Sequence, residues 1–257
     1  MLVVSAFWKR LSRMPSQTAK LGEWRIYETA EAVAEYAAEW LCALACACER
    51  EFAICLSGGS TPRSLYQYLA GNGIASRFPW NRVHWFWGDE RFVPHDDPAS
   101  NYRMAYEALF SRVPVSKDRI HAIQTEGVSP EQAATNYQML LQGYYGKKRF
   151  NVERPIFDVT LLGVGENGHT ASLFPNSVAL RENRRWVLAV IGETPQTRIT
   201  LTYPTLDSSR NLAFLVTGAN KKDILASIRA GDTQPPAARV HPVGHLFWFA
   251  DRAAMPS

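Results

Sequence analysis

The sequence predicts one α/β domain built on a doubly wound, mostly parallel sheet with helices on both faces. Apolar runs of strand length alternate with segments of helical periodicity along almost the whole chain, as this architecture requires. The run FDVTLLGVG at 157–165 is apolar at both odd and even positions, which is typical of a strand covered on both faces. In such sheets ligands bind outside the carboxyl ends of the strands, where glycine-rich loops lie in this sequence.

The first half of the chain opens with a strand and a long helix, in which Val33, Trp40 and Leu44 recur at helical spacing. Pro62 fits the first turn of a second helix, which Thr61 can cap. We expect strands at 24–27, 52–56, 83–87 and 119–123, and helices at 29–49, from 62 onwards, at 100–110 and at 129–144.

The second half continues the same alternation, again with short apolar runs as the main signal. We expect strands at 157–165, 186–190, 198–203, 211–218 and 245–250, and a helix at 220–229 between the last two strands. The loops SGGST, GDER, GVGENGH and TGANK then all fall at the carboxyl ends of strands. We find no internal repeat and no stretch long enough to be a domain linker.

Length and charge narrow the classes of function. A chain of 257 residues with 46% hydrophobic content can bury a substantial core. The formal charge of +4 comes entirely from four basic residues in the first 20 positions, which contain no acid, so the rest of the chain is balanced. A balanced body argues against a nucleic-acid surface, because such a surface needs a concentrated basic excess.

The N-terminal segment and the cysteines indicate the cellular compartment of the protein. Residues 1–22 are expected to be a disordered or weakly attached leader before a single domain at 23–257, and no segment is apolar for the roughly 20 residues that span a bilayer. Cys42 and Cys46 lie one helical turn apart, and Cys48 and Cys55 complete a group without a zinc-binding spacing. Small apolar filling and a reducing, cytoplasmic compartment fit these residues best.

The stretch GVGENGHTASLFP at 163–175 contains G-x-G-x-x-G, the phosphate-turn pattern of dinucleotide-binding proteins. That fingerprint requires a crossover helix and an acidic residue about 20 positions further on, at the end of the next strand. Here Pro175 ends any helix after about two turns. The residue about 20 positions beyond Gly168 is Leu188, which is not acidic. The alternative is a catalytic turn that presents His169.

The SGGST loop predicts an anion site. Gly58 and Gly59, between a buried strand and a helix, expose backbone N–H groups beside the hydroxyls of Ser60 and Thr61, and the helix dipole favours a negative charge there. The loop lacks the Gly-Lys-Ser/Thr ending of a nucleotide P-loop, so a monophosphate fits better than ATP or GTP. An ordinary tight turn is the alternative.

Further cations lie near other strand ends, where a phosphate oxygen could meet them. They are Arg91 in GDER, Arg198 in TPQTR and Lys221 in TGANKK. Two alternatives stay open: Asp89, Glu90 and Arg91 can form an internal ion-pair turn, and Arg198 can form a salt bridge at a strand edge.

The motifs SGGSTPRSLY, WGDERFVP, DPASNY, GVGENGHTASLFP, RITLTYP and VTGANKKDIL occur in this order. From about Glu23 to its end, the chain resembles the 6-phosphogluconolactonase family. That family is similar in fold to glucosamine-6-phosphate deaminase and ribose-5-phosphate isomerase, which share a Rossmann-like sheet without a dinucleotide. The resemblance implies hydrolysis of 6-phosphogluconolactone to 6-phosphogluconate in the oxidative pentose phosphate pathway, with no metal and no cofactor.

The resemblance also implies roles for individual residues. His169 corresponds to the base that activates water, and Asp89 to an acidic residue beside the sugar. The sugar-phosphate contacts correspond to Gly58, Gly59, Ser60, Thr61, Arg91, Arg198 and Lys221. Family members often have Asp where this chain has Asn167, so we expect Asn167 to orient the ring without supplying a charge. Glu166, next to it, is an alternative carboxylate.

Two other functions remain alternatives. The deaminase places a glutamate five residues after its histidine, whereas this chain has Phe174, which cannot carry a proton. A sugar-phosphate sensor without catalysis would normally carry a further DNA-binding or partner domain. The expected partner is therefore a small sugar-phosphate lactone, with no nucleic acid and no membrane, and the protein is expected to be a monomer or a small homo-oligomer.

Overall fold

A six-stranded sheet forms the centre of the computed structural model, which describes residues 22–71 and 73–256. All neighbouring strands of this sheet are parallel, and their order is β1-β9-β8-β5-β2-β3. The strands are β1 (Glu23–Tyr27), β2 (Phe52–Leu56), β3 (Val83–Trp87), β5 (Phe157–Leu162), β8 (Ser209–Val216) and β9 (His245–Asp251). The predicted leader at 1–22 lies, apart from its last residue, outside the described residues.

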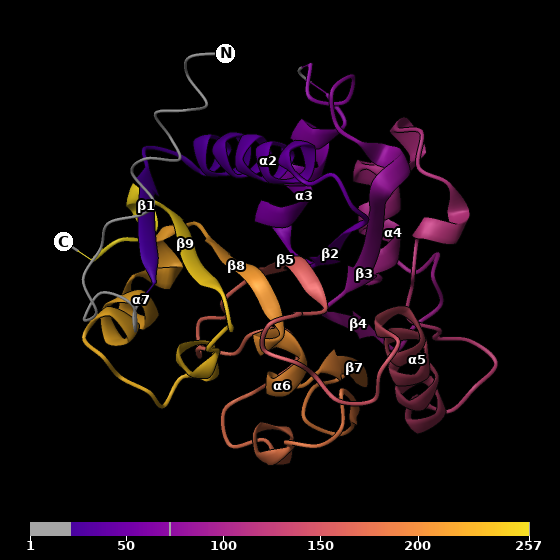
Figure 1. Cartoon of the computed structure of the whole chain (residues 1–257). Helices are drawn as coiled ribbons and strands as arrows, with labels where there is room; N and C mark the ends of the chain where they lie inside the picture. The colour runs from indigo at the N-terminus through magenta and orange to yellow at the C-terminus, as the bar shows by residue number, and fades with distance from the viewer. Residues whose placement is uncertain (1–21, 72, 257) are drawn as a thin grey trace.

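Helices cover both faces of the sheet, as predicted. Figure 1 shows α2 and α3 on one side of the sheet and α5, α6 and α7 on the other. The helices are α2 (Ala30–Ala47), α3 (Ser60–Leu69), α4 (Asn101–Ala108), α5 (Pro130–Tyr145), α6 (Tyr203–Asp207) and α7 (Lys222–Arg229). The structure thus confirms a doubly wound α/β fold. No helix among the described residues is both long enough and apolar enough to cross a membrane.

The direction of the chain reverses between β2 and β5. From β2 the chain continues outward to β3 on one side, whereas from β5 it continues to β8 and β9 on the other. Loops that leave two neighbouring strands in opposite directions open a crevice at the carboxyl edge of the sheet, and ligands bind there in this class of fold. The loops after β2 and β5 are SGGST and GVGENGH, so the two glycine loops flank this crevice.

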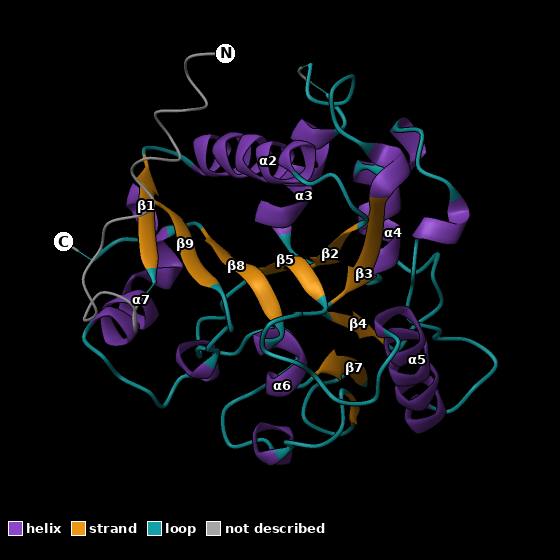
Figure 2. Ribbon diagram, viewed as in Figure 1, coloured by secondary structure: helices purple, strands orange, loops and turns teal. Residues whose placement is uncertain are grey.

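A second, three-stranded sheet was not predicted from the sequence. The expected strands at 186–190 and 198–203 form β6 (Val187–Val190) and β7 (Arg198–Leu201), which pair antiparallel with each other and with the unexpected strand β4 (Asp89–Arg91). A short connection joins β6 to β7, whereas a parallel neighbour needs a crossover of about a dozen residues or more. Figure 2 shows β4 and β7 below the main sheet, close to α5 and α6.

The strand predicted at 119–123 is wrong. A 3-10 turn occupies Lys117–Arg119, and only Ile120 forms an isolated bridge, to Trp85 of β3. The His121 amide also donates to the Trp85 carbonyl oxygen at 2.8 Å. Because the turn uses the beginning of the segment, too few residues remain beside β3 to form a ladder.

The core lies between the sheet and its helices. Every residue of β2 and of β5 is buried, as expected for parallel strands covered on both faces. Cys42 and Cys55 are buried and pack as small apolar residues, but Cys46 is exposed, so the apolar-filling interpretation fails for Cys46. All four thiols are free, and the sulfur atoms of Cys42 and Cys46 lie 3.9 Å apart.

Candidate active site

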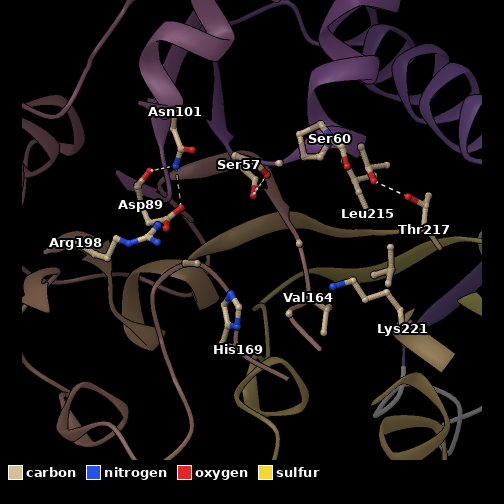
Figure 3. Close-up of a pocket in the computed structure, with 18 of the residues that line it drawn as sticks. Ser57, Ser60, Asp89, Asn101, Val164, His169, Arg198, Leu215, Thr217 and Lys221 are labelled. Carbon is tan, nitrogen blue, oxygen red and sulfur yellow. Dashed lines mark hydrogen bonds between the residues drawn. The ribbon is translucent and has the colours of Figure 1, made fainter. Parts of the chain in front are cut away.

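A cavity of about 450 Å³ lies at the carboxyl edge of the main sheet, where the chain direction reverses. Loops after β2, β3, β5 and β8 form its wall together with β4 and β7. It brings together nine of the predicted site residues: Gly58, Gly59, Ser60, Thr61, Asp89, Arg91, His169, Arg198 and Lys221. Figure 3 shows Arg198 and Lys221 entering from opposite sides, with His169 between them. Asn167 does not line this cavity, but it contacts the His169 ring.

The SGGST loop ends in a helix N-terminus that no side chain caps. Gly59, with φ of 106°, is the N-cap residue of α3, and no side chain among the described residues caps the helix. The predicted cap by Thr61 is wrong, because its hydroxyl bonds the hydroxyl of Thr217 at 2.8 Å. The amides of the first turn therefore have no side-chain acceptor and remain available to an anion at the cavity surface.

Two arginines of the second sheet face each other without an ion-pair partner in the described structure. Arg91 and Arg198 are direct cross-strand neighbours in β4 and β7, and both line the cavity. Both Nε atoms are buried, and neither has a hydrogen-bond partner among the described residues. Burial, and then the charge of Arg91, lower the pKa of Arg198. Like charges placed opposite each other destabilise a sheet, and an anion between them would remove that repulsion.

The GDER segment does not form the internal ion-pair turn that was the alternative. Among the described ion pairs, none joins Arg91 to an acidic residue. The buried Glu90 carboxylate accepts hydrogen bonds from the amides of Arg91, Asn101 and Tyr102, each at 2.7 Å, and so fixes the start of α4. Burial raises the pKa of Glu90. Asp89 instead faces the cavity, with 7% of its surface exposed.

The glycines of GVGENGH build a tight turn under the His169 ring. The Gly165 amide donates to the His169 carbonyl oxygen at 2.8 Å, and the Gly168 amide donates to that of Gly165 at 2.9 Å. A β-carbon on Gly165 would lie 2.0 Å from His169 Nδ1, and Gly168 has φ of 80°. These positions require glycine to bend the chain and seat the imidazole, a role independent of any dinucleotide.

Asn167 fixes the orientation of the ring. Its Oδ1 accepts from the His169 backbone N–H at 3.1 Å and lies 2.6 Å from His169 Nδ1. Because a backbone N–H only donates, the shared amide atom is the oxygen, and Nδ1 must then carry the proton. The Nε2 lone pair is left free. Glu166 accepts instead from Asn220 Nδ2 at 2.6 Å, so the alternative of a Glu166–histidine pair is wrong.

Several charges act on His169. Burial is the largest influence and lowers the pKa of His169. Asp89 raises that pKa, whereas Lys221, Arg198 and Arg91 lower it further. The net direction keeps the ring neutral near neutral pH, the state in which imidazole accepts a proton.

Comparisons with known proteins agree with this geometry. The family model of glucosamine-6-phosphate isomerases/6-phosphogluconolactonase matches residues 28–248. The chain belongs to this family. A 6-phosphogluconolactonase of Nostoc sp. is 41% identical over 206 residues, which cover 79% of this chain and 83% of that protein.

Solved structures extend the comparison. The crystal structure of 6-phosphogluconolactonase from Thermotoga maritima has a TM-score of 0.76 and 28% identity, and the match covers 90% of this chain and 99% of that one. A monomeric glucosamine-6-phosphate deaminase has a TM-score of 0.75 at 19% identity, over 90% of this chain and 98% of that one, which shows a common fold. Both branches of the family thus share this architecture.

Within the family fold, Phe174 distinguishes this site. Its ring packs against the His169 ring with 4.8 Å between centroids, and it lines the cavity. The position at which the deaminase was expected to carry a proton-transferring glutamate is therefore occupied by an apolar ring beside His169. A neighbour of this kind excludes water from one side of the imidazole and transfers no proton.

The sequence did not indicate two buried polar side chains of the site. Asn101 Nδ2 donates to the Asp89 carbonyl oxygen at 2.9 Å and contacts Asp89 Oδ1 at 3.4 Å, and its Oδ1 lies 2.1 Å from where a β-carbon on Gly58 would stand. The Ser172 hydroxyl donates to Asp89 Oδ2 at 2.7 Å. Both residues belong to quoted motifs, but only the tertiary structure turns them toward Asp89. Among the described residues, no group of three His, Cys, Asp or Glu side chains is arranged to hold a metal ion.

Proposed function

We propose that the protein hydrolyses 6-phospho-D-glucono-1,5-lactone to 6-phosphogluconate, a step of the oxidative pentose phosphate pathway. One observation carries the proposal: an oriented imidazole with a free nitrogen shares a single cavity with an uncapped helix N-terminus and three cationic side chains. A base and an anion site within one cavity match a phosphorylated sugar with an ester-like carbonyl. Similarity to 6-phosphogluconolactonases supports the same assignment.

The chemistry follows from the ring orientation. With Nδ1–H bonded to Asn167, Nε2 takes a proton from water while the water oxygen bonds to the lactone carbonyl carbon. The resulting oxyanion collapses and breaks the bond between that carbon and the ring oxygen. The imidazolium then returns the proton to the ring oxygen, so that one water molecule is consumed and His169 is regenerated. A positioned base of this kind contributes about a hundredfold to ten-thousandfold in rate.

The remaining residues bind and orient the substrate in this proposal. The amides of the Gly59–Thr61 turn donate to the phosphate at the start of α3, and Lys221, Arg91 and Arg198 supply positive charge to the cavity. The unpartnered Nε atoms of the two arginines support this role, because buried donors without acceptors are costly until a ligand satisfies them. Asp89 lies beside the sugar, opposite Lys221. The proposed compartment is the cytoplasm, consistent with four free thiols.

The test compares substrates and one variant. Purified protein is mixed with fresh 6-phosphogluconolactone, with unphosphorylated gluconolactone and with glucosamine 6-phosphate, while acid and ammonia release are recorded. We expect accelerated acid release from the phosphorylated lactone, much weaker acceleration with the unphosphorylated one, and no ammonia. Ammonia release without lactone hydrolysis would identify a deaminase, and ligand binding without turnover of either substrate would identify a sensor.

Replacement of the base tests the mechanism. His169→Ala should lower kcat for the phosphorylated lactone by about a hundredfold or more, because the general base is lost. Binding of 6-phosphogluconate, measured by calorimetry, should stay within a few-fold of wild type, since the anion site is untouched. Unchanged lactone turnover in this variant would reject His169 as the base.

A further inference from the structure

Asp89 is a buried carboxylate held by neutral groups. Only 7% of its surface is exposed, and none of the described ion pairs includes it. Its short hydrogen bond comes from the Ser172 hydroxyl at 2.7 Å, whereas Asn101 Nδ2 reaches the other carboxylate oxygen at 3.4 Å. Hydrogen bonds from a neutral hydroxyl to a carboxylate at this length are strong and directional. Ser172 therefore determines how the carboxylate is turned.

Ser172 also joins the His169 loop to the second sheet. Its backbone amide donates to Thr200 Oγ1 at 3.2 Å, and Thr200 is the cross-strand neighbour of Asp89. The two bonds attach Ser172 to β7 through its amide and to Asp89 of β4 through its hydroxyl. The side chain is completely buried, and it is not part of the cavity wall, so it does not meet the substrate.

A strained turn sets the relative position of His169 and Ser172. Between them, Ala171 has φ of 47°, a left-handed conformation that is uncommon for a residue other than glycine. The turn is closed by the Leu173 amide, which donates to the Thr170 carbonyl oxygen at 2.9 Å, and by the Thr170 hydroxyl, which donates to Gly163 at 2.9 Å. Strain of this kind persists where the surrounding structure enforces it, often at functional sites.

We propose that Ser172 is a positioning residue of this site: its hydroxyl holds the Asp89 carboxylate so that the negative charge faces the cavity and His169. The inference rests on the proposed function of His169 as a base. Asp89 is the acidic residue whose charge favours protonated His169, against the opposing charges of Lys221, Arg198 and Arg91. A carboxylate free to turn toward either arginine would lose that effect. In this way a residue outside the cavity sets the basicity of the catalytic imidazole.

The experiment measures His169 directly. The imidazole pKa and tautomer are read by nitrogen-detected NMR titration of the full-length protein, without substrate, in wild type, Ser172→Ala, Asp89→Asn and the double variant. We expect Ser172→Ala to lower the His169 pKa by about half a unit and Asp89→Asn to lower it at least as much. In the double variant the pKa should equal that of Asp89→Asn alone, because Ser172 acts through Asp89.

A matched control removes a comparable hydroxyl. Ser209 is also completely buried, and its hydroxyl bonds Thr160 and the Leu206 carbonyl oxygen away from the cavity. Ser209→Ala should reduce stability and leave the His169 pKa unchanged. If Ser172→Ala does not fold, Ser172→Cys replaces it, and its weaker S–H donor should give a smaller shift in the same direction.

Turnover gives a second, separate measurement. For 6-phosphogluconolactone we expect Ser172→Ala to lower kcat about tenfold with KM within about twofold, and to move the acidic limb of the rate profile to lower pH. An unchanged His169 pKa in Ser172→Ala, or an equal shift with and without Asp89, would overturn the proposal. If wild-type protein hydrolyses no lactone, the proposed function fails, while the NMR titration still decides the role of Ser172.

Discussion

The His169 ring occupies the space that a β-carbon at position 165 would need. That carbon would lie 2.0 Å from Nδ1 and 2.1 Å from Cε1 of the imidazole, far inside contact distance. The same ring is held by Asn167 on one side and packed against Phe174 on the other. The ring therefore cannot move away from an added β-carbon without losing its hydrogen bond to Asn167 or its position in the cavity.

The first prediction follows from this crowding. Gly165→Ala should push the ring from its position and lower kcat for the lactone by about a hundredfold, because a displacement near 1 Å can cost that much. Gly143→Ala is the control: Gly143 lies inside α5 with nothing within 4 Å of an added β-carbon. It should stabilise the protein by about 0.5–1 kcal/mol and keep full activity. Steady-state kinetics and urea unfolding of both variants check these outcomes, and equal activities would contradict the crowding argument.

Single residues also show how far the site could be predicted from sequence. His169 and the SGGST loop were recognisable because glycine, hydroxyl and imidazole groups at strand ends have few structural uses in such numbers. Asn101 and Ser172 were not, because a polar residue at a helix start or in a loop is normally exposed, and only the folded structure buries these two against Asp89. The Thr61 cap was wrong for a similar reason, since Thr217, which follows β8 and is distant in sequence, offers its hydroxyl a partner.

At the scale of elements, the parallel strands were predictable and the second sheet was not. The run 52–56 is apolar throughout and the run 157–162 is apolar at both odd and even positions, because helices cover both faces, and that pattern is visible in sequence. The short loop between β6 and β7 determines that these strands pair with each other and not with the main sheet. The three-residue strand β4 is recognised only by its pairing with β7. Strand pairing of this kind is a tertiary property, and the apolar pattern does not encode it.

The loop that carries Lys221 depends on an acid at the end of β9. Both carboxylate oxygens of Asp251 accept from the Gly218 amide, at 3.1 and 3.2 Å, and Oδ1 also accepts from Ala254 at 2.8 Å. Gly218 has φ of 97°, and it turns the chain between Thr217 and Lys221, both of which line the cavity. The hydrogen bonds of Asp251 thus hold one wall of the cavity.

Loss of this carboxylate should weaken binding more than catalysis. Asp251→Ala leaves a buried amide without its acceptor, which should destabilise the protein by about 1–3 kcal/mol and loosen the Lys221 loop. We expect KM for the phosphorylated lactone to rise several-fold with kcat almost unchanged. Asp232→Ala is the control, since its half-buried carboxylate accepts from Ser227 and Gln234, neither of which lines the cavity that contains His169. A lower kcat at constant KM would contradict the assignment of this loop to binding.

For the molecule as a whole, the cavity and a pair of histidines that make stability sensitive to acid lie at opposite ends of the sheet. The cavity is at the carboxyl ends of the strands, whereas a pair of stacked histidines packs beside the amino-terminal end of β3. His84 Nδ1 and His121 Nε2 lie 2.8 Å apart, and His84 also contacts Glu51 at 3.2 Å and Arg119 at 3.0 Å. Protonation of this pair therefore changes stability without contact with the residues that line the cavity.

Stability should fall in acid through these histidines. Burial, and then the charge of His84, lower the pKa of His121 to about 4 from an ordinary value near 6.5. Between these values the unfolded chain holds the proton that folded His121 has released, so the free energy of unfolding decreases as pH falls. Asp207 has the opposite effect, because burial raises its pKa to about 6. Its contribution to the free energy of unfolding therefore decreases as pH rises from about 4 to about 6.

Two variants separate the effects of His121 and Asp207 on the pH dependence of stability. His121→Phe keeps the ring that stacks on Phe86, with 4.5 Å between centroids, but it has no proton to bind. The free energy of unfolding of His121→Phe minus that of wild type should increase as pH is lowered from about 7.5 to about 4.5. The same difference for Asp207→Asn should increase as pH is raised over this interval. Urea unfolding at four pH values measures both differences. If the two differences change with pH in the same direction, the burial of one of these groups does not control its ionisation, and the acid sensitivity of the fold has another origin.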